Sequence, residues 1–438
     1  MDERIKKKFE KIDTLIVLAT ENQIVNYLSL FLFDKKYIQS ENFKIYSIIN
    51  KDAIGKFNNY KLHNRFVNLF KNSVYKGKLQ NITEKEENSI LIEKGVIAVR
   101  VENLNSIDIF EPEIISELEK RKVLWNVTGG QRKLTIAVQK YISERRKETD
   151  LMAYFDGNEN EFSIYDFETE AGMFTTKSNE KLVNLEEMLL SLGINTKKNI
   201  EDIKWSSNGY DKEIKDLEII KKGCELVLKK LNEEDSEAFL NELLESNRLC
   251  NVYDNQVPKI LEKYLGNEVE DYVRFLKNRH IEYLEKSKNK KSKVNEFGKI
   301  FEDIVFFGLI DLIEKDQEIK KKIVDVRKSY KVRDEKSKMI DELDIVITLK
   351  DGKLIVIECK TGSMTGDNAK STNYTTYMLS GVYGMPLLIV PMIKGKIVLE
   401  LKDKEDSYYY CVKSVKSAIR CNLEYYGIDK LKDILKTL

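Results

Sequence analysis

The chain of 438 residues is poor in histidine, cysteine and proline, and its charges almost cancel. Its two histidines, His63 and His280, argue against acid–base catalysis by a histidine pair within one chain. The five cysteines lie far apart without a C-x-x-C pair, which argues against structural zinc and favours free thiols in a reducing cytoplasm. With 74 Lys and Arg residues against 73 Asp and Glu, net charge gives no argument for nucleic-acid binding.

Long apolar runs and the glycine signatures of nucleotide enzymes are missing as well. No signal peptide and no apolar span long enough to cross a membrane is recognisable, so we expect a soluble cytoplasmic protein with no membrane partner. Neither G-x-G-x-x-G nor G-x-x-x-x-G-K-[ST] occurs in the sequence. The length predicts about two or three domains.

Two predicted strands near residue 350 form the most informative part of the sequence. The stretch 341–362, DELDIVITLKDGKLIVIECKTG, indicates two apolar strands joined by an Asp-Gly turn. Successive side chains of a strand point to opposite faces, so Glu358 and Lys360 project together and Cys359 points away. Asp344 lies on the preceding strand.

Charged side chains at the end of such a buried strand need partners, because a charge left alone near a core is costly. Two carboxylates and one ammonium at a strand edge can bind a hard divalent cation and steady a phosphate. This is the chemistry of metal-dependent phosphodiester cleavage. The alternative is a structural ion pair beside an ordinary hairpin.

An upstream helix supplies a further carboxylate. Residues 295–308 have apolar side chains at helical spacing, with Glu302 set among them. A helix with one embedded glutamate, followed by a hairpin with D…E-x-K, resembles the PD-(D/E)xK nuclease family in its branch with a helical glutamate. The resemblance covers residues 295–395, and the proline of the family's name is absent because Leu343 precedes Asp344.

The resemblance implies a role for each matching residue. Asp344 and Glu358 would be metal ligands, with the main-chain carbonyl of Cys359 as a further ligand of Mg²⁺ or Mn²⁺. Lys360 would orient the attacking water or stabilise charge on the phosphate. Glu302 would support this metal ion or a second one.

Two loops in the first 150 residues predict a ligand site. A buried strand at 14–19 ends in a polar loop, and a helix is expected over 24–33; the loop residues are Thr20, Glu21, Asn22 and Gln23. A second strand at 123–127 is followed by a glycine-containing loop and a helix; the loop residues are Thr128, Gly129, Gly130, Gln131, Arg132 and Lys133. Glycines let main-chain amides approach an anion at a helix N-terminus, where Arg132 and Lys133 would add to a phosphate seat. A plain turn between strand and helix is the alternative.

Further apolar strands at 45–49 and 96–101 alternate with helices, which indicates a doubly wound parallel α/β sheet with its ligand outside the carboxyl ends of the strands. These two loops, with a nuclease-like domain downstream, resemble the CARF sensor domains of type III CRISPR systems. The whole chain resembles the ancillary CARF nucleases with a C-terminal PD-(D/E)xK domain. The resemblance implies a Rossmann-like sensor, antiviral defence, and activation by a cyclic oligoadenylate, usually cyclic tetra-adenylate, bound across a homodimer.

We therefore expect a sensor at 1–150, a hairpin and helical linker or insertion at 151–290, and a restriction-endonuclease-like α/β nuclease domain at 291–438. The helical segment 213–288 has one apolar stripe and no assigned role. Residues 320–338 carry nine Lys and Arg against three acidic residues, immediately before the proposed catalytic hairpin. A single-stranded RNA or DNA substrate would lie there, whereas the alternative is a solvated charged face.

Three other functions stay open. Arg274 and His280 have the spacing of the Arg-x4–6-His motif of metal-independent HEPN ribonucleases, which are also found fused to CARF domains. A second alternative is a CARF-controlled nucleic-acid-binding regulator. A third is a restriction or repair nuclease with an unrelated nucleotide-binding front end. The sequence does not distinguish RNA from DNA, because phosphate contacts carry no base information.

Overall fold

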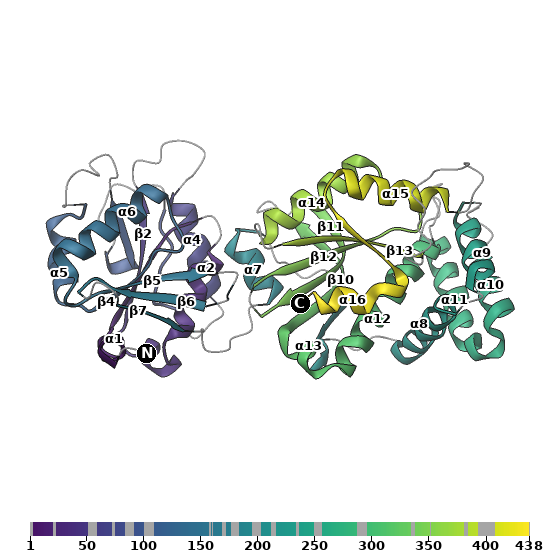
Figure 1. The fold of residues 1–438 in the computed structure, drawn as a ribbon, viewed down its shortest axis with the longest axis horizontal. Coiled ribbons are helices and arrows are strands. Elements are labelled where there is room, and N and C mark those ends of the chain that lie inside the picture. The colour runs from purple at the N-terminus through teal and green to yellow at the C-terminus, as the bar shows by residue number, and fades with distance from the viewer. Residues whose placement is uncertain are drawn as a thin grey trace. The chain divides into compact units, whose positions relative to one another are not determined.

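The computed structural model describes the chain as a series of ranges. These are residues 3–20, 23–50, 59–71, 75–83, 92–99, 109–156, 159, 161–168, 172–176, 184–194, 203–211, 216–233, 236–248, 256–286, 296–333, 338–350, 352–380, 384–392 and 408–437. The fold is mixed α/β with two seven-stranded sheets. One compact unit takes in Met1–Thr196 and the other most of Lys197–Leu438 (Figure 1).

The sheet of the first unit has the strand order β3-β2-β1-β4-β5-β6-β7. Its strands are β1 (Thr14–Leu18), β2 (Lys44–Asn50), β3 (Val96–Val99), β4 (Val123–Asn126), β5 (Leu151–Asp156), β6 (Glu161–Asp166) and β7 (Gly172–Thr176). The first five pair in parallel, and β6 and β7 add an antiparallel edge. β1 and β4 are buried along their whole length, which explains their continuous apolar sequences. The expected parallel sheet is confirmed, and its order is that of doubly wound folds.

Short helices and turns connect these strands. They are α1 (Glu3–Phe9), α2 (Ile24–Leu28), η1 (Ser29–Leu32), α3 (Lys35–Gln39), α4 (Asn59–Phe70), η3 (Ile92–Lys94), α5 (Pro112–Glu119), α6 (Arg132–Tyr141), the π-helical turn η4 (Ile142–Arg146) and α7 (Leu185–Ser191). The helix expected over 24–33 is α-helical only to Leu28 and continues as a 3₁₀ turn. Ser29 Oγ donates to the carbonyl oxygen of Asn26 at 2.6 Å, a local bond that competes with α-helical geometry.

The sheet of the second unit has the order β14-β13-β12-β11-β10-β8-β9. Its strands are β8 (Ile203–Ser206), β9 (Gly209–Tyr210), β10 (Ile323–Arg333), β11 (Met339–Leu349), β12 (Leu354–Cys359), β13 (Met385–Val390) and β14 (Glu424–Gly427). The predicted hairpin is confirmed, because β11 and β12 are antiparallel with Ile345 opposite Ile357. β12, β13 and β14 run parallel.

Helices cover both faces of this sheet. They are α8 (Leu217–Leu231), α9 (Ser236–Arg248), α10 (Gln256–Leu265), η5 (Gly266–Val269), α11 (Glu270–Lys286), α12 (Glu296–Lys315), α13 (Gln317–Lys322), α14 (Gly366–Ser380), α15 (Tyr409–Arg420), η8 (Ile428–Lys430) and α16 (Leu431–Lys436). Figure 1 shows α14 and α15 on one face and α12 on the other. In the described part of the chain, no helix is long and apolar enough to span a bilayer.

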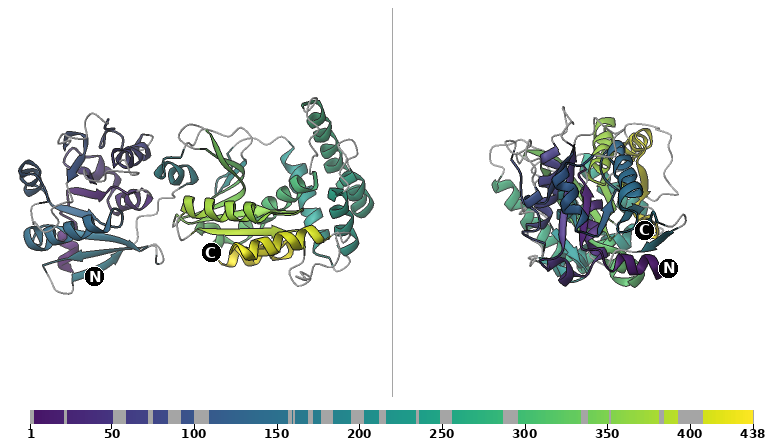
Figure 2. Two further views of the ribbon diagram at one scale, coloured as in Figure 1. Left: turned by 90° about the horizontal axis from the view of Figure 1, so that it is seen from above. Right: turned by 90° about the vertical axis from the view of Figure 1, so that its left-hand side faces the viewer.

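The division into units differs from the expected domain boundaries at 150 and 290. β5 begins at Leu151 and pairs in parallel with β4, so the hairpin of β5 and β6 continues the first sheet. Helices α8 to α11 share one hydrophobic core with α12 and the second sheet. They are the teal helices that gather at one end of this unit in Figure 2. Their apolar stripes need this partner, because an amphipathic helix is stable only when its apolar face is buried.

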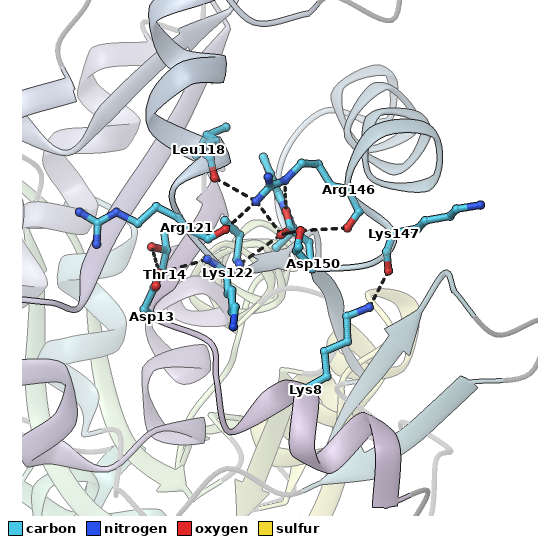
Figure 3. Close-up of polar contacts among 12 residues, drawn as sticks. Lys8, Asp13, Thr14, Leu118, Arg121, Lys122, Arg146, Lys147 and Asp150 are labelled. Carbon is cyan, nitrogen blue, oxygen red and sulfur yellow. Dashed lines mark hydrogen bonds and ion pairs between the residues drawn. The ribbon is translucent and has the colours of Figure 1, made fainter.

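A buried ion pair closes the amino-terminal end of the first sheet. Arg146 donates to both carboxylate oxygens of Asp150, from Nε at 3.0 Å and from Nη2 at 2.9 Å. Nη2 also donates to the carbonyl oxygens of Leu118 and Arg121, at 2.9 and 2.6 Å (Figure 3). Trp125 Nε1 donates to Asp150 at 2.8 Å. The network therefore ties α5, β4 and β5 together at the end opposite the predicted ligand loops.

This network predicts a large loss of stability when the guanidinium is removed. Arg146→Ala leaves the buried Asp150 carboxylate without its counter-ion, so the free energy of unfolding should fall by about 3–5 kcal/mol. Chemical denaturation measures the change. Arg145→Ala is the matched control, because Arg145 is the exposed neighbour in the same turn and its loss should change stability by less than about 0.5 kcal/mol. Equal losses in the two variants would contradict the assignment.

Candidate ligand and nuclease sites

The two predicted ligand loops meet at one place in the first sheet. β1 pairs with β2 on one side and with β4 on the other, so the strand order reverses between β1 and β4. In open α/β sheets, ligands bind outside the carboxyl ends of the strands at this reversal. The loops after β1 and β4 both start there. Glu21 and Asn22 lie outside the described residues.

Two glycines allow the loop after β4 to lie against the end of β1. A Cβ on Gly129 would be 2.7 Å from Thr20 Cγ2 and 3.0 Å from the Leu18 carbonyl oxygen. A Cβ on Gly130 would be 2.7 Å from Leu18 Cβ, and Gly130 has φ +87°, in the left-handed region that favours glycine. The Gly-Gly pair is therefore required by close packing of the two loops, whatever ligand they hold.

Polar side chains fix the start of the loop after β4. Asn126 Oδ1 accepts from the amide of Thr128 at 3.1 Å and from its hydroxyl at 2.6 Å. The Thr128 oxygen in turn accepts from the amide of Phe155 on β5 at 2.7 Å. Asn50, the last residue of β2, donates to Gln131 Oε1 at 2.9 Å. These bonds hold the loop in one shape before any ligand arrives.

The loop after β4 leads directly into the N-terminus of α6. Gln131 is the N-cap residue and makes no side-chain bond to the free amides of the first turn. Arg132 and Lys133 are the first two residues of the helix, and both are exposed. Exposed amides with two cations beside them suit an anionic ligand.

Gln23, which the sequence suggested as a ligand contact, points into the protein interior. Its side chain is fully buried, and Nε2 donates to the carbonyl oxygens of Thr20 at 2.5 Å and Leu62 at 3.0 Å. Its main-chain amide donates to the carbonyl oxygen of Ser191 at the end of α7, at 3.2 Å. Gln23 therefore holds the loop after β1 in place from its buried side.

In the second unit, the structure brings Asp344, Glu358 and Lys360 together at the end of β12. Lys360 Nζ is 3.7 Å from Asp344 Oδ2 and forms a shorter ion pair with Glu358. The amide of Cys359 donates to Asp344 Oδ2 at 2.9 Å, which fixes that carboxylate against the strand end. All three charged side chains are largely buried.

Burial and mutual repulsion perturb these carboxyl groups. Burial, followed by the charge of Asp344, raises the pKa of Glu358 to about 7. Burial also raises the pKa of Asp344, although Lys360 and the Cys359 amide oppose it. Burial disfavours the ammonium of Lys360, but the two carboxylates outweigh burial and raise its pKa. Ionisable groups with such perturbed pKa values cluster at functional sites of proteins.

Glu302, on α12, belongs to the same electrostatic group. Burial raises its pKa to about 8, and the charge of Asp344 adds to that rise. Its neighbours on α12 are apolar and buried, with Phe301 and Ile304 fully buried, so the helix holds Glu302 next to the core. A carboxyl group held in such a place needs cations or a proton.

A second group of charges beside Glu302 was not predicted. Asp303 accepts from Lys328 Nζ on β10 at 2.8 Å and from Arg279 Nη1 on α11 at 3.1 Å. Burial opposes the charge of Asp303, but the two cations outweigh it and lower its pKa. Lys328 also acts on Glu302 and Asp344. The position of Lys328 in the basic run was the one available sequence signal, and nothing local pointed to Arg279.

The donor set fits a hard divalent cation, although its atoms are not yet arranged around one. Within the described ranges, no group of three or more His, Cys, Asp or Glu side chains is placed to hold a metal ion. Asp344 and Glu358 nevertheless offer oxygen ligands of the kind that Mg²⁺ prefers. The ammonium of Lys360 lies on Glu358, so ligation would require it to leave that carboxylate.

The alternative HEPN motif finds less support in the geometry. Arg274 and His280 are both on α11, and Arg274 is exposed and pairs with Glu270 at 3.1 Å and Asp271 at 3.6 Å on its own helix. Arg279, between them in sequence, is the residue of this helix that reaches the buried charges.

Solved structures share this fold. The structure of Can2 from Sulfobacillus thermosulfidooxidans in complex with cyclic tetra-adenylate has a TM-score of 0.58 and 14% identity, covering 99% of this chain and 99% of that chain. The structure of protein VC1899 from Vibrio cholerae has a TM-score of 0.57 and 14% identity, covering 97% of this chain and 96% of that one. No protein-family model and no curated protein matches the sequence. At these identities, the likeness shows a common fold along almost the whole chain.

The packing of the loop after β4 predicts a graded loss of stability. Gly130→Ala places a methyl group against Leu18 at a positive φ, so the free energy of unfolding should fall by about 2–4 kcal/mol. Gly77→Ala is the matched control, because Gly77 has φ +89° but no atom within 4 Å of the added Cβ. It should cost about 1 kcal/mol. Equal losses on chemical denaturation would show that backbone conformation alone requires Gly130.

Proposed function

We propose that this chain is a divalent-metal-dependent nuclease, activated by a cyclic oligoadenylate, that acts in type III CRISPR antiviral defence. The main support is that one chain contains two sites. In the first sheet, two loops suited to bind phosphate meet where the strand order reverses between β1 and β4. In the second sheet, the D…E-x-K residues gather at the end of β12. The shared fold with Can2, whose structure holds cyclic tetra-adenylate, makes that ring the first activator to test. The first unit would be the CARF sensor and the second the PD-(D/E)xK nuclease.

The ligand site of the first unit suits a symmetric, phosphate-bearing ring. Free amides of α6 with Arg132 and Lys133 can bind phosphates, while Thr20 offers a hydroxyl at the end of β1. We propose that two chains pair through this unit and bind one ring across their two-fold axis, because a closed symmetric ligand matches a two-fold site. Binding would favour the nuclease arrangement that admits substrate, to the extent that the ring binds that arrangement more tightly.

The residues of the second unit suit hydrolysis of a phosphodiester in single-stranded RNA or DNA. A bound Mg²⁺ or Mn²⁺ would supply a Lewis acid and a water molecule of lowered pKa. Asp344 and Glu358 would hold it, together with the Cys359 carbonyl, and Glu302 would support it from α12. Lys360 would then be released from Glu358 to orient the water or to stabilise charge on the phosphate.

Removing one catalytic carboxylate should abolish cleavage without affecting the sensor. Glu358→Gln keeps the shape of the side chain but loses a ligand charge, so cleavage with Mn²⁺ and cyclic tetra-adenylate should fall about a thousandfold or more. Binding of the ring, measured by calorimetry, should be unchanged. Glu318→Gln is the control, because Glu318 is an exposed glutamate of the same unit. Loss of ring binding in Glu358→Gln would refute the division into two functional units.

The reverse result is expected at the start of α6. Arg132→Ala with Lys133→Ala removes two charge-assisted contacts to the ring, so its affinity should fall about a hundredfold. Cleavage should then need correspondingly more activator, while the melting temperature stays the same. Lys120→Ala is the control, since Lys120 is exposed at the opposite end of this sheet. Unchanged affinity in the double variant would place the phosphate site elsewhere.

A further inference from the structure

Helix α14, which follows the nuclease hairpin in the chain, presents two tyrosines to solvent. It begins shortly after Lys360, and Tyr374 is 70% exposed while Tyr377 is 40% exposed. Residues three apart in a helix are neighbours, so the two side chains leave α14 next to each other. The opposite face of α14, including Leu379, is buried. The tyrosines therefore contribute little to the core.

The flank of α14 next to these tyrosines is bonded to the nuclease hairpin. Thr375, the neighbour of Tyr374, donates its hydroxyl to Asp341 Oδ2 at 2.6 Å, and Ser371 donates to the same oxygen at 3.4 Å. Asp341 lies on β11 three residues before Asp344, and its charge contributes to the raised pKa of Glu358. A strand lying across Tyr374 would therefore pass the Asp341 end of β11, the strand that carries Asp344.

We propose that Tyr374 and Tyr377 form a stacking surface for the bases of single-stranded nucleic acid whose backbone enters the site of Asp344, Glu358 and Lys360. The inference rests on the proposed nuclease function and names the class of its substrate. Bases of a single strand are free to stack on aromatic rings, whereas those of a duplex already stack on one another. Every base has an aromatic face, so such a surface binds without sequence preference.

The surroundings of the tyrosines favour a nucleic acid over a protein partner. Lys370, one turn before Tyr374, is exposed, and its pair with Asp367 at 3.8 Å is exposed on both sides, so the pair is weak. Its ammonium is available to a phosphate. A stable interface between chains needs a contiguous apolar centre depleted of charge, and this charged, polar helix face does not provide one.

The test compares strand binding by three variants without added divalent cation, so that affinity is read separately from cleavage. Tyr374→Ala with Tyr377→Ala removes the rings, and Tyr374→Phe with Tyr377→Phe keeps them. Ile419→Ala is the control, because Ile419 is an exposed apolar residue on α15 of the same unit. The probes are fluorescein-labelled single-stranded DNA of about 20 nucleotides, RNA of the same sequence, and the same DNA with abasic sites in place of its bases.

The double alanine variant should bind the base-containing strands about tenfold or more weakly, while the double phenylalanine variant and the control bind like the parent chain. On the abasic strand, the parent and the double alanine variant should bind equally. A loss restricted to DNA or to RNA would support the proposal and identify the strand. In a cleavage assay, the same substitution should raise KM with little change in kcat.

Two results would overturn the proposal. One is equal affinity of the parent and the double alanine variant for base-containing strands, or an equal loss on the abasic strand. The other is a shift from dimer to monomer in sedimentation velocity with strand affinity unchanged, which would assign the surface to a second copy of the chain. If the parent binds strands through its tyrosines but cleaves none with Mg²⁺ or Mn²⁺, the nuclease proposal fails while the stacking surface stands.

Discussion

The second unit depends on holding several acidic groups at the end of an otherwise apolar pair of strands. Asp344 and Glu358 repel each other there, and burial adds to the cost of their charge. Lys360 offsets part of that cost by lying against both carboxylates. The hairpin can carry these groups because most of its apolar residues are buried, several of them in a large common core. Stability supplied by that core allows a cluster of acids that is unfavourable by itself.

The same constraint explains why the helical layer belongs to this unit. Asp303 follows Glu302 on α12, and each of its two oxygens binds a cation from a different element, β10 or α11. These bonds add to the apolar packing that holds α12 in place, and Glu302 is the residue next to Asp303 on this helix. Lys328 and Arg279 thus connect the layer to the acidic group without being part of the hairpin. The helices α8 to α11, which the sequence suggested were a linker or insertion, are thus part of the core of the second unit.

Local sequence patterns predicted the elements that carry the site, but not the contacts that hold them. Two apolar runs joined by an Asp-Gly turn predicted the hairpin, and the period of two along a strand predicted that Glu358 and Lys360 lie on one side. Helical spacing gave Glu302. Nothing local could show that Arg279 reaches Asp303, or that the side-chain amide of Gln23 donates to the carbonyl oxygen of Leu62, because those partners are brought together only by the fold.

The bond between Gln23 and α7 has a mechanical consequence. The main-chain amide of Gln23 binds the Ser191 carbonyl, and its side chain binds the Thr20 carbonyl, so one residue joins the tip of β1 to the last turn of α7. α7 is the last described element before the chain enters β8. A displacement of the β1 tip would therefore strain a bond to the last helix of the first unit. The described bonds of the loop after β4 run instead to Asn126, Phe155 and Asn50, so of the two ligand loops it is the one after β1 that is bonded to α7.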